Sequence, residues 1–201
     1  KALTFSTSKD KDDTYKWNVN PPGYTPVPMY GEMAMEGVVP GYLVSVSLTR
    51  MLARVDVENK VSGEVFQLEE IFLVNYNTSG YIAPKWDETT GVLVPDPYTA
   101  NENPMIPVPS GKQPGTEEAA MKYGYKQAAN APGALMAGKI YTYEAVKNVA
   151  ADPKNGVCLV VKGKYRGEDY YYRVDFTRTA GEAADVACMP LYRNHKYVVT
   201  I

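Results

Sequence analysis

The sequence predicts an all-β protein with two β-sandwich domains, and three observations support this prediction. Tyrosine occurs 17 times and phenylalanine only 4 times, and tyrosine suits half-buried sheet surfaces because its ring is apolar and its tip polar. The 15 prolines and 16 glycines favour short strands and long connections. Two β-rich stretches flank a proline-rich segment, so we expect domains at residues 1–132 and 133–201, joined within residues 112–138.

Composition sets limits on the class of protein. Of the 201 residues, 45% are hydrophobic and 22% charged, which is ordinary for a folded protein. The net charge of −2 argues against a nucleic-acid binder or a binder of anionic membranes. No apolar run reaches the roughly 18–20 residues that span a bilayer. The two cysteines, Cys158 and Cys188, are either buried thiols or one disulfide bridge.

The first predicted strands lie in the N-terminal half. Apolar and polar residues alternate over residues 3–5, which predicts a short edge strand. Residues 41–57 form a stronger element, but the parity of its apolar residues changes between Leu48 and Met51. A strand cannot keep both sets on one face, so we expect a β-bulge or a single helical turn there.

A second strong element covers residues 65–76. Five apolar residues share one parity and are expected on one face: Phe66, Leu68, Phe72, Val74 and Tyr76. Ile71 and Leu73 occupy the other face. A strand that is apolar on both sides should be central in its sheet and covered on both faces.

The chain becomes β-rich again from residue 139. Four strands are expected at residues 140–143, 157–165, 170–177 and 197–201. Residues 166–169 fit a hairpin turn between the second and third of these strands. Tyr172, Val174 and Phe176 should face the core. Between the two β-rich stretches we expect short strands near residues 81–82 and 92–94. Residues 117–129 have the best helical composition in the chain, although Gly124 weakens it.

The sequence contains few candidates for catalytic or metal-binding residues. His195 is the single histidine, and a general base needs a nucleophile or carboxylate within reach, so a structural or surface role is favoured. Asp10, Asp12 and Asp13 invite a calcium site, but the glycine and glutamate of an EF-hand loop are missing. The sequence also contains no Cys and His residues with the spacing of a zinc site, no glycine-rich phosphate-binding loop and no nucleophile elbow. We therefore expect no enzyme, no cofactor and no catalytic, cofactor-binding or metal residues.

Six segments taken in order resemble one family. They are residues 28–32, 48–57, 66–75, 141–144, 171–176 and 190–197, the last of which contains Arg193, Asn194 and His195. Together they resemble the fimbrillins of Bacteroidales, the subunits of type V pili. The resemblance covers residues 28–76 and 139–201, and the segment between these ranges is unmatched.

The resemblance implies two transthyretin-like β-sandwich domains and no catalytic residues. Family members are exported as lipoproteins, a trypsin-like protease removes the first strand, and a neighbouring subunit fills the groove. We therefore expect a structural subunit of a fimbria on the cell surface. Its partners would be other pilin subunits and a host or bacterial receptor. Its groove would bare core residues such as Val55 or Phe72.

Two features of the family fall outside this sequence. The lipidated leader and the further C-terminal β-structure of the family are not part of it, so we expect either a chain cut at both ends or a processed form. The alternative function is a tip or accessory adhesin that binds carbohydrate or protein. In that case Trp17 and Trp86 should lie on its binding face. An enzyme is the third alternative, although no carboxylate pair in the sequence is singled out for it.

Overall fold

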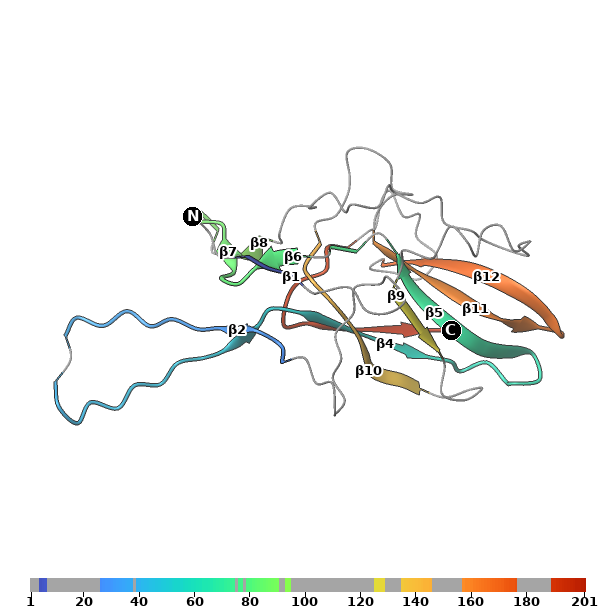
Figure 1. The fold of residues 1–201 in the computed structure, drawn as a ribbon, viewed down its shortest axis with the longest axis horizontal. Helices are drawn as coiled ribbons and strands as arrows, with labels where there is room; N and C mark the ends of the chain where they lie inside the picture. The colour runs from blue at the N-terminus through green and yellow to red at the C-terminus, as the bar shows by residue number, and fades with distance from the viewer. Residues whose placement is uncertain are drawn as a thin grey trace.

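Strands are the only regular elements in the described part of the chain (Figure 1). The structure is a computed structural model, and it describes residues 4–6, 26–37, 39–74, 76–77, 79–90, 93–94, 125–128, 135–145, 157–176 and 189–201. The strands are β1 Thr4–Ser6, β2 Met29–Tyr30, β3 Thr49–Arg50, β4 Ala53–Glu58, β5 Phe66–Val74, β6 Ser79–Tyr81, β7 Lys85–Trp86, β8 Leu93–Val94, β9 Tyr125–Ala128, β10 Leu135–Thr142, β11 Cys158–Tyr165, β12 Glu168–Asp175 and β13 Lys196–Thr200. For these residues the all-β prediction is confirmed.

Two sheets face each other across a shared core. The first has the order β10-β4-β13 and the second the order β12-β11-β5-β9. Val55 and Val57 of β4 pack in one cluster with Leu73 of β5 and Leu159 of β11, and all four are 0% exposed. This arrangement is a β-sandwich. Three smaller sheets pair β1 with β6, β2 with β3 and β7 with β8, so the strand expected near residues 3–5 is present as β1.

The sandwich joins the two stretches that we expected to be separate domains. β10 pairs with β4, and β11 pairs with β5, so each large sheet contains strands from both 1–132 and 133–201. The same hydrophobic cluster contains Val55 and packs against Val174. The described strands therefore form one sandwich rather than two domains divided after residue 132. The proline-rich segment has the composition of a linker, but strands from its two sides pair with each other.

Strand β5 is central and buried on both faces, as its double apolar pattern predicts. It lies between β11 and β9, with Leu73 in the shared core and Phe72 in a second cluster on the other face. However, Phe66 and Leu68 pack with Leu73 and not with Phe72, contrary to their parity. The reason is a register shift with β11 just before Gly163, because a bulge moves later side chains to the opposite face.

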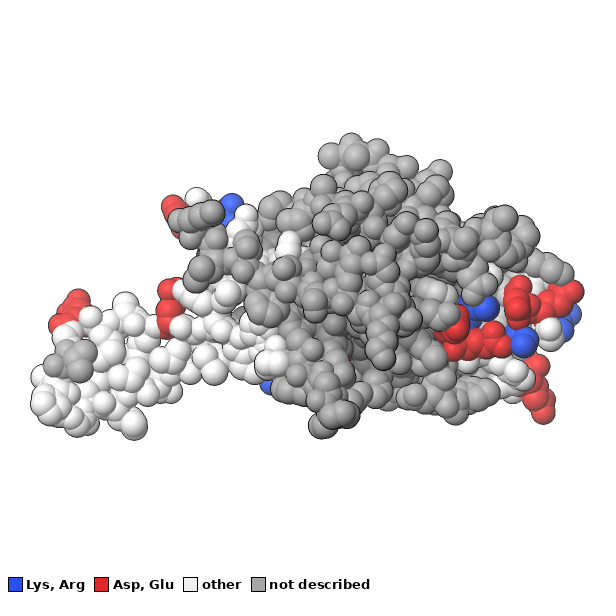
Figure 2. Space-filling view, viewed as in Figure 1, with Lys and Arg blue, Asp and Glu red and all other residues white. Residues whose placement is uncertain are grey.

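A long arm extends from the base of the first sheet (Figure 1). It comprises residues 31–37 and 39–48, and β2 and β3 pair at its base. Its apolar side chains face solvent, with Leu43 92% exposed and Leu48 60% exposed, and Figure 2 shows few charged residues along it. The predicted strand over residues 41–57 is thus only partly correct. Residues 41–48 are outside the core, and the chain bends at Met51, next to the predicted interruption.

The β11–β12 hairpin agrees with its prediction. Arg166 and Gly167 have φ angles of 51° and 85°, and a two-residue turn with positive φ at both positions matches the twist of paired strands. Tyr172, Val174 and Phe176 pack in the shared core as expected.

Candidate functional site

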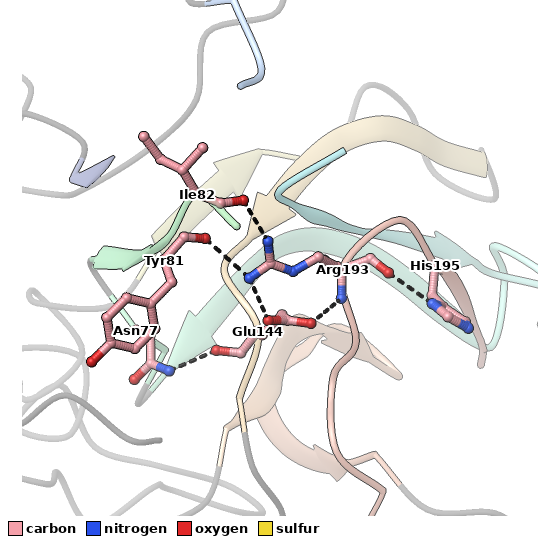
Figure 3. A network of polar contacts seen from close by, with 6 residues as sticks. All are labelled: Asn77, Tyr81, Ile82, Glu144, Arg193 and His195. Atoms are coloured by element: carbon pink, nitrogen blue, oxygen red, sulfur yellow. Dashed lines mark hydrogen bonds and ion pairs between the residues drawn. The ribbon is translucent and has the colours of Figure 1, made fainter. Parts of the chain in front are cut away.

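A buried ion pair joins the segment before β13 to the end of β10 (Figure 3). The side chains of Arg193 and Glu144 are both 0% exposed, and Nη2 of Arg193 lies 2.7 Å from Oε2 of Glu144. The other carboxylate oxygen, Oε1, accepts a hydrogen bond from the backbone N–H of Arg193 at 3.0 Å. Two charge-assisted contacts to one carboxylate offset the cost of removing both charges from water.

Backbone carbonyls complete this network. The guanidinium of Arg193 donates to the carbonyl oxygens of Ile82 at 2.8 Å and Tyr81 at 3.0 Å. The side-chain amide of Asn77 donates to the carbonyl oxygen of Glu144 at 2.6 Å. We call these five residues the Arg193–Glu144 network. It holds together three segments that are distant in sequence, and it thereby fixes where β13 begins.

This network is hard to predict from the sequence. Arg193 and Glu144 were not among the candidate functional residues, because arginine and glutamate are usually solvated. The only available signal is that each has aromatic or apolar neighbours in sequence, namely Tyr143 and Ala145 beside Glu144 and Tyr192 beside Arg193.

His195 lies on the edge of the network. Its Nδ1 is 2.8 Å from the carbonyl oxygen of Arg193, and its ring centroid lies 5.7 Å from that of Tyr192 and 6.5 Å from that of Tyr197. None of its contacts with described residues is to a carboxylate, serine or cysteine side chain. These contacts are typical of a histidine that stabilises a loop, which is the role that the sequence favours.

We expect His195→Ala to lower the free energy of unfolding by at most about 1–2 kcal/mol, because the variant loses one hydrogen bond and partly exposed ring contacts. Chemical denaturation followed by circular dichroism measures this change. Any hydrolase activity in the unaltered chain that is lost in His195→Ala would contradict a purely structural role.

A cavity of about 340 Å³ adjoins His195. On the outer face of the first sheet, Arg54 of β4 is paired in register with Tyr141 of β10 and with Lys196 of β13, and all three line the cavity. Arg50 and Asn194 also line it, and Nη1 of Arg50 lies 3.4 Å from Oδ1 of Asn194. The walls therefore carry three permanent positive charges.

Only one of these charges has a carboxylate partner among the described residues. Arg54 contacts Asp56 through Nε–Oδ1 at 2.7 Å and Nη2–Oδ2 at 2.8 Å, and the N–H of Gly138 donates to Asp56 at 2.9 Å. Burial alone would raise the pKa of Asp56, but the hydrogen bonds from Arg54 and Gly138 and the charges of Arg54 and Lys196 outweigh it, so this pKa is lowered. The ionised Asp56 compensates Arg54, whereas Arg50 and Lys196 have no carboxylate within ion-pair distance in the described part of the chain.

The outer edge of β13 is open among the described strands. Its only strand partner there is β4, in parallel. The N–H of Arg54 donates to the carbonyl of His195, and the N–H of Ile201 donates to the carbonyl of Glu58. Odd-numbered residues of this segment thus direct their backbone groups toward β4. In an extended strand the backbone groups of the intervening residues, such as Val198, point the opposite way.

The remaining candidates are not brought together with these features. Five of them lie outside the described residues: Asp10, Asp12, Asp13, Trp17 and Cys188. Cys158 is buried in β11, and Trp86 is 52% exposed in β7. In the ranges that the structure describes, no three His, Cys, Asp or Glu side chains gather into a group that could hold a metal ion.

Comparison with known proteins adds no assignment. No protein-family model matches the sequence, and no curated protein matches it significantly. The described residues include no helix with the length and apolar character needed to cross a bilayer. Function therefore has to be inferred from the sandwich, its open edge and its cavity.

Proposed function

We propose that the chain is a structural subunit of a bacterial surface fimbria, and that a neighbouring subunit adds a strand to β13 during assembly. Support comes from the six segments that resemble the fimbrillins of type V pili. The all-β sandwich is compatible with the transthyretin-like architecture of that family, which we extend to this chain as part of the proposal. The proposal places the protein outside the cell, with a precursor that is attached to the outer membrane by a lipid.

The observation that carries the proposal is the outer edge of β13, with which no other described strand pairs. Open edges are templates for pairing with another chain, and proteins protect them with bulges, charges or proline. The edge strand β10 has a register irregularity between Met136 and Ile140, and four of the eight residues of β12 are charged. In contrast, β13 pairs in unbroken register with β4, and Lys196 is its only charged residue.

The edge differs from the groove that the family resemblance led us to expect. Val55 is 0% exposed and Phe72 is 3% exposed, so the apolar groove that should bare them is not found. Because no core side chain is bared at these positions, an added strand would gain affinity from main-chain hydrogen bonds along β13. Specificity would come from contacts with outward-facing side chains such as Val198.

Replacing Val198 by proline tests the proposal. Val198 is 51% exposed and its N–H points away from β4, so proline removes no hydrogen bond within the sandwich but removes the central donor of the open edge. We expect Val198→Pro to stay monomeric on size-exclusion chromatography under conditions in which the unaltered chain forms a ladder of oligomers. Electron microscopy should show filaments for the unaltered chain only.

Val198→Thr is the matched control, because threonine keeps both the N–H and the β-branched shape. This variant should assemble like the unaltered chain. Normal assembly of Val198→Pro would show that β13 is not the acceptor edge. The structural role itself would be refuted if the unaltered chain did not polymerise and antibody to it did not label fimbriae on producing cells.

The second candidate function is the adhesin, and the cavity beside His195 is the observation that favours it. The tryptophans do not support it, because Trp86 does not line that cavity and Trp17 lies outside the described residues. A subunit of a fimbria can carry both an assembly edge and a binding cavity, so the two roles are compatible.

A further inference from the structure

The cavity on the outer face of the first sheet has an unusual charge balance. Arg50 and Lys196 line the same space, and neither has a carboxylate partner among the described residues, whereas Arg54 is compensated by Asp56. Positive charges that share a concave surface repel each other, and a concave surface concentrates their field. An anion in the cavity would relieve this repulsion.

The shape of the cations indicates which anion fits. The guanidinium of Arg50 presents a planar fork of donors that matches the two oxygens of a carboxylate, and the ammonium of Lys196 acts as a point charge. Arg50 makes one long side-chain contact, at 3.4 Å to Asn194, so its other donors are available. A carboxylate placed between Arg50 and Lys196 would be bound from two sides.

The rest of the lining indicates what carries the carboxylate. Tyr141, Asn194 and His195 line the cavity together with the apolar residues Val27 and Leu52. The hydroxyl, amide and imidazole groups of the three polar residues offer both donors and acceptors. A volume of about 340 Å³ is at the lower end of the range for small-molecule sites. A single Asp or Glu side chain would leave most of it empty, whereas a monosaccharide ring would occupy more of it and use the polar groups.

We propose that this cavity binds an acidic sugar residue, with the sugar carboxylate on Arg50 and Lys196 and its hydroxyl groups on Tyr141, Asn194 and His195. The described lining comes from one chain, so binding does not require strand addition at β13. The site would give the subunit an affinity for glycans that carry uronic or similar acids.

The test is a nuclear magnetic resonance titration of the full chain with glucuronate, glucose and inorganic phosphate. We expect glucuronate to bind in the millimolar range, and glucose to bind at least about tenfold more weakly because it lacks the charge. The amide signals of Asn194 and His195 should shift with glucuronate. Arg50→Gln and Lys196→Gln should each weaken glucuronate binding by about tenfold.

Arg166→Gln is the matched control, because it removes one exposed positive charge at the β11–β12 turn, in the other sheet, and should leave the affinity unchanged. Four results would overturn the proposal: no binding of glucuronate, equal binding of glucose, tighter binding of phosphate, or unchanged affinity in both glutamine variants. Tighter binding of a short glutamate-bearing peptide would assign the cavity to a protein ligand instead. If monomeric Val198→Pro bound glucuronate with unchanged affinity, glucuronate binding would not depend on assembly through β13.

Discussion

Arg193→Ala is expected to lower the free energy of unfolding by about 3–5 kcal/mol, because it leaves the buried carboxylate of Glu144 without its positively charged partner. Both side chains are 0% exposed, and the variant also deprives the carbonyls of Tyr81 and Ile82 of their donors. Urea denaturation followed by circular dichroism measures the change.

A double variant identifies the cause of that loss. Arg193→Ala combined with Glu144→Ala should be less destabilised than the sum of the two single variants, since neither charge is then left alone. Lys164→Ala, which removes an exposed ion pair with Glu69, should have a far smaller effect. If Arg193→Ala were no more destabilising than Lys164→Ala, the network would not be important for stability.

Leu73→Ala and Leu159→Ala are each expected to cost about 2–5 kcal/mol, as for other buried leucines. The two residues are paired in register between β5 and β11, and both are 0% exposed. They come from opposite sides of the domain boundary that the sequence predicted. In a single sandwich, both variants should lower the midpoint of the same cooperative unfolding transition.

Differential scanning calorimetry distinguishes this result from its alternative. Two transitions, with Leu73→Ala affecting one and Leu159→Ala the other, would restore the division into two domains and contradict the shared core. Val198→Ala is the control, because its side chain is half exposed and most surface substitutions change stability by less than about 0.5 kcal/mol.

Features that depend on neighbouring residues were predictable from the sequence. The β11–β12 hairpin follows from a valine-rich run before Arg166 and Gly167 and a tyrosine-rich run after them, and the core positions Tyr172 and Val174 follow from their parity. The burial of β5 on both faces follows from its apolar residues at both odd and even positions. Each of these inferences requires only the period of a strand and the chemistry of one turn.

Features that depend on distant partners were not predictable. One bulge opposite Gly163 placed Phe66 and Leu68 on the face that their parity excludes. The predicted division into two domains does not hold for the described strands, because β4 precedes the predicted boundary and pairs with β10 and β13, which follow it. No local pattern in the sequence encodes such pairing. The Arg193–Glu144 network was not predicted for the same reason, since its two charged residues are 49 positions apart and their apolar and aromatic neighbours in sequence do not identify either as the other's partner.

The parallel pairing of β4 with β13 also has a kinetic consequence. Arg50 and Asn194, which meet beside this pair, are 144 positions apart in the chain. Closing so long a loop costs entropy before any contact compensates for it, and folds dominated by such contacts form slowly. During synthesis, β4 leaves the ribosome long before β13 exists. Docking of β13 is therefore expected to be a late step of folding, and until then a chaperone that covers β4 would protect the chain from aggregation.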